Sequence, residues 1–484
     1  MNPQAIDLVV PFGARSALRR AVSVACAGTL LGALGLTMAS PSLAADAPST
    51  GVQAGPLTLQ FNGFTALESV YRDKNETADI GSNFNTAIPF NYQPNAHISE
   101  FRETARQSRF AMLAKGPSGG GWSAEYYLET DFLSAGVSSN SNESNSYTLR
   151  MRHFYGVLRN SNADWYVLGG QNWSFATLYS EGDLAPRSEQ VPATIEAQYA
   201  TGFNWLRDPQ LRFVKTWGKT AAVGISLEEP QAQFSNASGA LITNTGGSLL
   251  NSTTNYALDF APDIIVKGAI DPGFGHFEIY GMARGFRDRF AATAAGTNHS
   301  TWGTSVGGGM VLPVVGKTLT LQLSALGGKG IGRYGTSALP DATVKGDGTP
   351  AAISGFDGLA GLTFKPTGAL TIYAYYGIEQ ADNTVFDNAL GAAAYGYGTL
   401  STTVNTGCTL VTGTAATCNG VTHRIEQYNI GDWWKVYQGT IGNVQIGLQY
   451  SHTTRKLFAD PLGNAPTADI NMGFFSFRYY PFQR

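Results

Sequence analysis

The sequence has few cysteines, few charged residues and, beyond residue 44, no long apolar run. Cysteine occurs 3 times in 484 residues, and charged residues make up 14% of the chain. The net charge of −3 lacks the basic excess typical of nucleic-acid-binding proteins, so we expect no nucleic-acid partner. Apolar runs beyond residue 44 stay below the roughly 18 residues that a membrane-spanning helix needs. Helical membrane spans are therefore excluded from that part of the chain.

Histidines are also few, and they do not cluster. The sequence contains 6 histidines, namely His97, His153, His276, His299, His423 and His452. None has a second ligand at the spacing of a zinc site. We therefore expect no metal and no cofactor.

The two cysteines of the C-terminal half are close in sequence. Cys408 and Cys418 lie in a stretch rich in Thr, Gly, Ala and Asn. Because no other metal ligand is near, this spacing predicts a local disulfide, which requires an oxidising compartment.

The N-terminus has the pattern of an export signal. Arg15, Arg19 and Arg20 precede an apolar stretch, residues 21–38, and Ser42-Leu43-Ala44 gives a small-x-small cleavage site. We predict a cleaved signal peptide at residues 1–44, a short periplasmic segment at 45–56 and one large domain at 57–484. The expected location is the bacterial outer membrane.

Residues 122–133 alternate between two kinds of side chain. Glu125, Tyr127, Glu129 and Asp131 fall on one side, and Ala124, Tyr126, Leu128, Thr130 and Phe132 fall on the other. This alternation predicts a strand with one wet face and one apolar face. Similar segments recur down the chain, for example at residues 57–71, 101–115 and 255–270.

We count sixteen such strands, joined alternately by short turns and by long polar loops. An even number of strands with this loop pattern predicts an all-β fold, a 16-stranded antiparallel transmembrane β-barrel. A periplasmic sandwich or propeller is the alternative. It is disfavoured because its strands are typically about five or six residues long, whereas several here are twice that length.

Six short stretches resemble bacterial porins of the DcaP-like group. They are Gln107-Ser108-Arg109-Phe110, Glu129-Thr130-Asp131-Phe132, Leu149-Arg150-Met151-Arg152-His153, Gly170-Gln171-Asn172-Trp173, residues 328–335 and Phe477-Arg478-Tyr479-Tyr480-Pro481-Phe482. The resemblance implies a homotrimeric channel whose third external loop folds inward, and which takes small anions such as dicarboxylates. Two features depart from the group. No N-terminal coiled coil is visible, and the chain ends in Gln483-Arg484 instead of an aromatic residue.

Strand alternation predicts which charged side chains face the pore. Apolar neighbours on the opposite parity, such as Leu149 and Met151, place five arginines and three acids inside the barrel. These are Arg109, Arg150, Arg152, Arg212 and Arg284, with Glu125, Glu129 and Asp131. Two interpretations stay open. The arginines either form a neutral ion-pair network with the acids, or they form a basic ladder that attracts anions.

The segment 173–209 is too long for a turn and is our candidate constriction loop. It carries the acids Glu181 and Asp183, and further along Arg187, Glu189 and Glu196. Acids opposite wall arginines would set a transverse field across the passage. The alternative is an ordinary exposed loop.

Two short strings match enzyme motifs. Residues 330–335 read G-x-G-x-x-G, and residues 303–307 read G-x-S-x-G around Ser305. Neither precedes a helical pattern, so we interpret both as chance matches.

Together these patterns predict a porin that forms a water-filled channel for passive diffusion of small hydrophilic solutes, with a leaning toward anions. Its partners would be those solutes and outer-membrane lipid, and no enzymatic activity is expected. The alternatives are a lipase-like barrel enzyme that uses Ser305 and a non-conducting adhesin or structural barrel.

Overall fold

The computed structural model describes residues 51–134, 148–235, 244–247, 251–256, 259–290 and 296–483. The expected signal peptide, residues 1–44, lies outside this part. No helix within these ranges is long and apolar enough to cross a membrane. Its helical elements are the short 3₁₀ turns η2 (Pro94–His97), η3 (Ala197–Tyr199), η4 (Gly332–Tyr334) and η5 (Ala415–Thr417).

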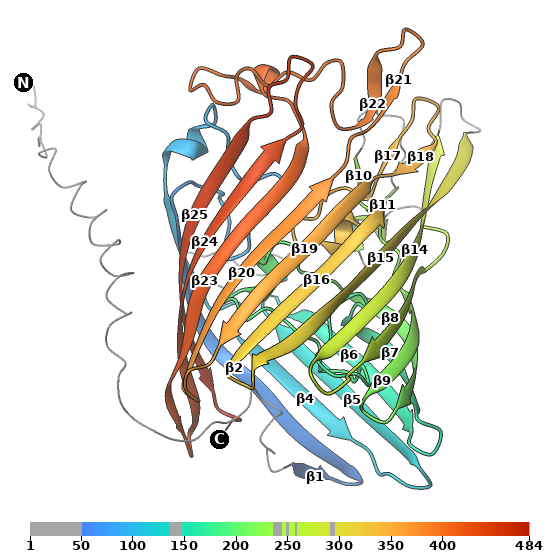
Figure 1. Ribbon diagram of the computed structural model, residues 1–484, viewed down its shortest axis with the longest axis vertical. Helices are drawn as coiled ribbons and strands as arrows, with labels where there is room; N and C mark the ends of the chain where they lie inside the picture. The colour runs from blue at the N-terminus through green and yellow to red at the C-terminus, as the bar shows by residue number, and fades with distance from the viewer. Residues whose placement is uncertain are drawn as a thin grey trace, which may run out of the picture. The chain divides into compact units, whose positions relative to one another are not determined.

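The described chain forms one large antiparallel sheet of 18 strands, of which β1 and β3 pair only with β2. The other 16 strands form a closed ring, because β25 pairs with β2 (Figure 1). In order, they are β2 (Leu57–Arg72), β4 (Arg109–Lys115), β5 (Trp122–Asp131), β6 (Arg150–Asn160), β7 (Trp165–Trp173), β8 (Arg207–Trp217), β9 (Ala221–Glu228), β13 (Asp263–Ile270), β14 (His276–Phe290), β15 (Thr297–Val315), β16 (Leu319–Lys329), β19 (Ser354–Phe364), β20 (Leu370–Ala381), β23 (Thr422–Gly439), β24 (Gly442–Leu457) and β25 (Thr467–Tyr480). The predicted all-β, 16-stranded barrel is confirmed.

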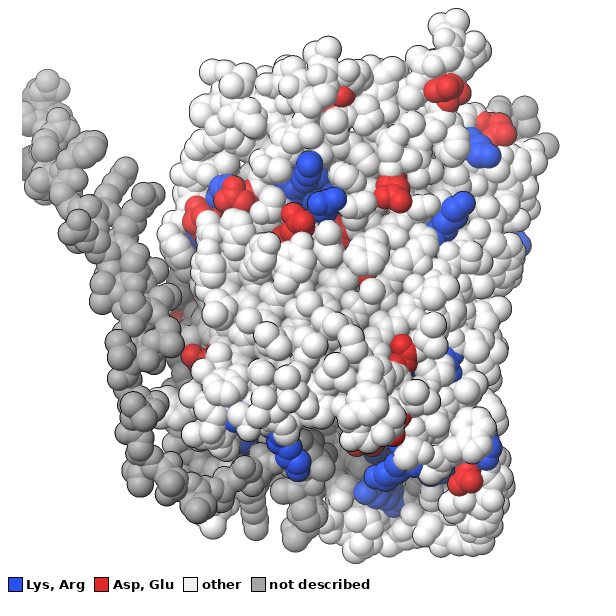
Figure 2. Space-filling model, viewed as in Figure 1, with Lys and Arg blue, Asp and Glu red and all other residues white. Residues whose placement is uncertain are grey.

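Side-chain exposure alternates along the strands, as the sequence predicts. In β9, Val223, Ile225 and Leu227 are exposed, whereas the residues between them are buried. Figure 2 shows the result on one wall, where a broad band almost free of charge lies between charged zones near the two ends of the strands. An outward apolar band of this kind is typical of barrels that stand in lipid.

The predicted strand at residues 101–115 is interrupted. It forms β3 (Glu100–Thr104) and β4, which both pair with β2 but are separated by residues 105–108. A turn forms there, with the amide of Ser108 donating to the carbonyl of Ala105. From this turn the Arg106 side chain donates to the carbonyl of Phe132 at 2.9 Å, and the Arg106 carbonyl accepts from the amide of Phe132 at 3.0 Å.

The predicted strand at residues 255–270 is wrong in its first half. The barrel strand β13 begins only at Asp263, after a separate hairpin of β11 (Asn244–Gly247) and β12 (Asn251–Tyr256). Pro262 directly precedes β13. Because proline has no backbone N–H, it cannot donate to a sheet ladder at this point.

Short strands outside the ring lie in the connections. β1 (Val52–Ala54) forms a hairpin with β2 and falls within the predicted N-terminal segment. Long connections form two further small sheets, β10 (Phe234–Ser235) with β17 (Ala342–Val344) and β18 (Pro350–Ala352), and β21 (Thr384–Asp387) with β22 (Ala393–Tyr397).

Candidate channel constriction

Loop 3 (residues 174–206) folds into the barrel, as expected. Its first half donates backbone hydrogen bonds to carboxylates on β9, on β14 and in the turn after β13. These bonds join Phe175 to Glu228 at 2.7 Å, Tyr179 to Glu278 at 3.0 Å and Gly182 to Asp271 at 2.7 Å. The acceptors come from the turn end and the inner wall, so the loop reaches deep into the lumen.

The second half of loop 3 crosses to the opposite wall. Backbone amides of Ile195, Thr201 and Gly202 donate to side chains on β24, β23 and β20, namely Gln449, Gln427 and Glu379. Gly202 has φ +81°, and a Cβ there would lie 2.0 Å from the carbonyl oxygen of Gly358. Only glycine lets the loop backbone approach the wall this closely.

Much of the inner wall is apolar and is covered by loop 3. Phe175, Tyr179 and Leu184 from the loop pack against inward residues such as Val214 and Ile265, all of them buried. This half of the lumen is therefore a packed core. Strand alternation alone would have assigned it to the water-filled passage.

Arg212 and Arg284 point inward but lie beneath loops. Arg212 donates to the carbonyl of Trp173 at 2.8 Å and lies over the ring of Phe175 at 4.3 Å. Arg284 forms ion pairs of 2.8 Å with Asp263 and 2.6 Å with Asp341. Both arginines are almost fully buried. They fasten loops to the wall, so we remove them from the candidate constriction.

Opposite this core, a cavity of about 310 Å³ lies between loop 3 and the wall of β4–β7 and β25. Its charged lining residues come from both sides. The wall provides Arg109, Glu129, Arg152 and Arg478, and loop 3 provides Arg187, Glu189 and Glu196. The structure thus brings three of the predicted site residues, Arg109, Glu129 and Arg152, to one narrow place.

The wall arginines on β6 are paired with acids on β5. Arg150 donates to both carboxylate oxygens of Asp131, at 2.9 and 2.7 Å. Arg152 lies 3.0 Å from the same carboxylate and also contacts Glu129. Arg109 lies 3.9 Å from Glu129. This arrangement favours the ion-pair network over an unopposed basic ladder for Arg150 and Arg152.

A β-bulge places an additional side chain in the cavity. The β5–β6 register shifts between Glu129 and Thr130, so Arg152 and His153 both face inward although they are neighbours in sequence. His153 hydrogen-bonds to Asn172 at 2.9 Å. Strict alternation from Arg152 would direct His153 outward, and a bulge cannot be read from a period of two.

Glu125 has a different partner from the other acids of β5. Arg187 of loop 3 donates to both its carboxylate oxygens at 3.2 Å and lies over the ring of Tyr127 at 5.4 Å. A loop arginine therefore neutralises this acid.

Two arginines at or beside the cavity were not predicted from the sequence; Arg478 lines it, and Arg207 lies next to its lining residue Trp173. Arg478 forms an ion pair with Glu68 and lies 3.6 Å from a carboxyl oxygen of Glu196 of loop 3. Arg207 lies over the ring of Trp173 at 4.6 Å, and its buried Nη1 has no hydrogen-bond partner among the described residues. Arg478 could have been found by alternation, since Phe477 and Tyr479 flank it.

The predicted loop acids Glu181 and Asp183 do not line this cavity. They flank Gly182 at the loop tip, beside Asp271, where Glu181 is exposed and Asp183 accepts a bond from Ala185. The acids that face the wall arginines are Glu189 and Glu196. The sequence showed all four acids but could not show where the loop turns back.

Both of these loop acids lie in surroundings that favour the neutral carboxyl. Burial raises the pKa of Glu196 to about 8, and the nearby Glu68 adds to the effect while Arg478 opposes it. Burial also raises the pKa of Glu189. Near neutral pH, Glu196 is therefore largely uncharged.

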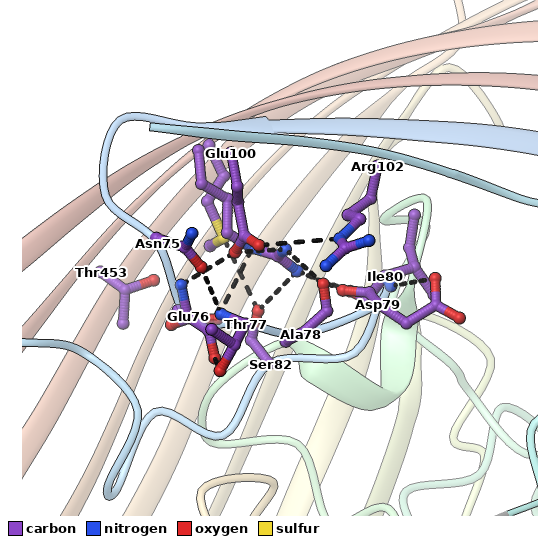
Figure 3. Close-up of polar contacts among 12 residues, drawn as sticks. Asn75, Glu76, Thr77, Ala78, Asp79, Ile80, Ser82, Glu100, Arg102 and Thr453 are labelled. Atoms are coloured by element: carbon purple, nitrogen blue, oxygen red, sulfur yellow. Dashed lines mark hydrogen bonds and ion pairs between the residues drawn. The ribbon is translucent and has the colours of Figure 1, made fainter. Parts of the chain in front are cut away.

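Loop 1 (residues 73–99) also folds inward, and residues 75–82 of this loop make a cluster of polar contacts with Glu100 (Figure 3). Arg72 forms ion pairs of 3.5 Å with Glu76 and 3.0 Å with Glu100, and it donates to the carbonyls of Ala78 and Asp79. Apolar residues of the loop pack against buried residues near the long-loop ends of β2, β23 and β25. They are Ile80, Phe84, Ile88 and Phe90.

The predicted disulfide is present. Cys408 and Cys418 are bonded, with their Cα atoms 4.8 Å apart. They lie in loop 7 (residues 382–421), where Asn91 of loop 1 donates to the carbonyl of Thr409 at 2.9 Å. The cross-linked loop thus contacts loop 1.

The enzyme-like strings have no catalytic surroundings among the described residues. Ser305 is buried on β15, and within those ranges its Oγ has no hydrogen-bond partner. The string at residues 330–335 follows β16 and contains only the three-residue turn η4. Over the same ranges, no group of three or more His, Cys, Asp or Glu residues is arranged to hold a metal.

A closed ring of 16 antiparallel strands with a loop folded into its lumen is the porin fold. Within that class, the chain is similar to the crystal structure of the outer membrane channel DcaP of Acinetobacter baumannii. The TM-score is 0.61 at 17% identity, covering 89% of this chain and 99% of that one. The fold is therefore that of a DcaP-like porin.

Weaker similarities to other solved outer membrane proteins are also present. OmpT in its trimer form, an outer membrane protein of Vibrio cholerae, has a TM-score of 0.47 at 9% identity, covering 88% of this chain and 100% of that one. The anion-selective porin from Comamonas acidovorans has a TM-score of 0.46 at 10% identity, covering 88% of this chain and 99% of that one. No protein-family model matches the chain, and no curated protein matches it.

Proposed function

We propose that this protein is an outer-membrane porin through which small hydrophilic solutes diffuse passively, with a preference for anions. The observation that carries the proposal is the charged cavity between loop 3 and the barrel wall. It lies inside the barrel of a porin fold and is lined by charged side chains of the wall and of loop 3. No covalent step is assigned to any residue, and the solute gradient drives transport.

The anion preference follows from the balance of charge around the cavity. The charged residues that line it are four arginines, Arg109, Arg152, Arg187 and Arg478, and three acids, Glu129, Glu189 and Glu196. With all groups ionised, the arginines exceed the acids by one. Protonation of Glu196 increases this excess, and a narrow low-dielectric passage strengthens the field of that excess charge.

The further parts of the proposal rest on the sequence and on the resemblance. Dicarboxylates are the proposed solutes and a homotrimer the proposed assembly, because the DcaP-like resemblance implies both. Export through a cleaved signal peptide at residues 1–44 would deliver the chain to the outer membrane.

Reconstitution into planar lipid bilayers tests the proposal. Stepwise conductance increases in potassium chloride are expected as single barrels insert. Closed membranes at protein concentrations that yield folded, heat-modifiable barrels would instead favour a structural or adhesive barrel. Hydrolysis of a lipid ester that disappears in Ser305→Ala would favour the enzyme.

A further inference from the structure

A row of polar side chains leads away from the constriction along the inner wall. Arg478 on β25 is the register partner of Gln445 on β24, and Gln445 is the register partner of Lys435 on β23. Because Arg478 lines the cavity, the row begins at the constriction. It ends near the turns that join the strands at the end opposite the long loops.

The lumen side of Lys435 is fixed by its neighbours. Trp433, two residues earlier on the same face, donates from Nε1 to the carbonyl of Ala193 in loop 3 at 2.8 Å. The guanidinium of Arg478 lies over the Trp433 ring at 4.6 Å. Trp434, between Trp433 and Lys435, is exposed on the outer wall. Alternation therefore directs Lys435 toward the lumen.

A second lysine approaches the same place from the other side of β20. Lys365 directly follows β19, where Phe364 is exposed outward and Thr363 bonds inward to Tyr375 at 3.3 Å. The same alternation directs Lys365 inward. The amide of Lys435 donates to the carbonyl of Ala369, in the turn that Lys365 begins, at 2.8 Å.

These two lysines have no acidic partner among the described residues, where neither forms an ion pair. Burial, followed by the positive charge of Lys435, lowers the pKa of Lys365 to about 8, and no carboxylate counters that shift. Asp432 lies close in sequence, but its register partners Ile372 and Leu448 are exposed on the outer wall, so it faces away. Two like charges close enough to influence each other, without a counter-ion, favour the binding of an anion between them.

We propose that Lys365 and Lys435 form a second anion site at the turn end of the lumen, which takes small oxyanions such as phosphate or carboxylates after they pass Arg478. The proposal rests on the proposed channel function, because a solute reaches the pair from the constriction. An anion would then meet two basic sites in turn, one at Arg478 and one at the two lysines, with Gln445 between them. The occupant is a solute oxyanion and not the phosphate of a lipid headgroup, since both lysines face the lumen.

Block of single-channel chloride current by inorganic phosphate tests this site. We expect saturable block when phosphate is added at the turn end of the barrel at pH 7. In the double variant Lys365→Gln with Lys435→Gln, the half-blocking concentration should rise about tenfold, the equivalent of losing about 1.4 kcal/mol of binding. Lys219→Gln is the matched control, because Lys219 is an exposed turn lysine on the other side of the ring. The half-blocking phosphate concentration of Lys219→Gln should equal that of the unmodified protein.

Two outcomes would overturn the site. One is block that the double substitution leaves unchanged. The other is block that appears only when the bilayer lacks phosphate-bearing lipids, which would mean that lipid headgroups normally occupy the pair. If the barrel does not conduct, phosphorus NMR of phosphate with the detergent-solubilised protein decides the matter. If the unmodified protein broadens the phosphate resonance and the double variant does not, the site is supported although the channel function fails. If neither protein broadens the resonance, the site is rejected.

Discussion

Nη2 of Arg478, on the last barrel strand, lies 3.6 Å from Oε1 of Glu196, on loop 3. This contact joins the wall to the loop at the narrow part of the passage. Glu196 has its pKa raised to about 8 by burial. The charge of the constriction therefore depends on a loop acid that titrates close to physiological pH.

The first prediction concerns the pH dependence of ion selectivity. Glu196 is neutral below about pH 8 and becomes anionic as pH rises, so anion preference should fall between pH 6 and pH 9. A unit charge about 10 Å from a passing ion in water changes its energy by about 0.4 kcal/mol, or about twofold in permeability ratio. Zero-current potentials across this range measure the change. In Glu196→Gln, the fall in anion preference between pH 6 and pH 9 that is due to Glu196 should vanish. If the fall is unaltered in this variant, another titrating group causes it.

The second prediction concerns the wall arginines. The double variant Arg150→Ala with Arg152→Ala removes two positive charges and leaves Asp131 and Glu129 without their β6 partners. We expect the anion preference to fall about fourfold or more by the same Coulomb argument. Lys219→Ala is the control. Unchanged selectivity in the double variant would mean that these arginines act only in the structure of the wall.

The third prediction concerns the attachment of loop 3. Glu379 accepts hydrogen bonds from the amides of Gly202, Thr336 and Ser337 at 2.7, 2.9 and 2.8 Å. Glu379→Ala leaves these buried donors unpaired, which should cost about 2–4 kcal/mol and free the loop. Single-channel conductance should rise and become noisy.

Glu181→Ala is the matched control for loop 3, because this acid is exposed at the loop tip and does not line the cavity. Its conductance should equal that of the unmodified protein. A quiet, unchanged conductance in Glu379→Ala would show that the other attachments suffice to hold the loop.

The fourth prediction concerns the disulfide in loop 7. Reducing Cys408–Cys418 releases a short closed loop and removes about 3 kcal/mol of local stabilisation on entropic grounds. Protease should then cut within residues 382–421 while the barrel stays folded, as seen by its mobility in unheated gels. Cys408→Ser should behave like the reduced protein without reductant. Loss of the folded barrel band would mean that the disulfide supports the whole domain.

The barrel was predictable because it depends on local alternation. The alternation of polar and apolar side chains can be read within a single strand. The period of two at residues 122–133 therefore predicted β5 (Trp122–Asp131) to within two residues. The failures occurred where a strand departs from that period. A turn at residues 105–108 interrupts one predicted strand, and a bulge turns His153 inward.

The constriction was only partly predictable, because it depends on how loops fold back. Alternation correctly put Arg212 inside the ring, but it could not show that Phe175 and Tyr179 would cover it. In the same way, the acids of loop 3 were visible in the sequence. Their assignment to Glu181 and Asp183 failed because the loop tip extends past the cavity to Asp271.

The zero-current potential of single barrels under a potassium chloride gradient at pH 6 tests the central claim most directly. At this pH Glu196 carries a proton and the cavity arginines exceed the ionised acids, so the potential should have the sign of a chloride-selective channel. A potential of zero, or one of the sign set by potassium, would contradict an anion-preferring constriction.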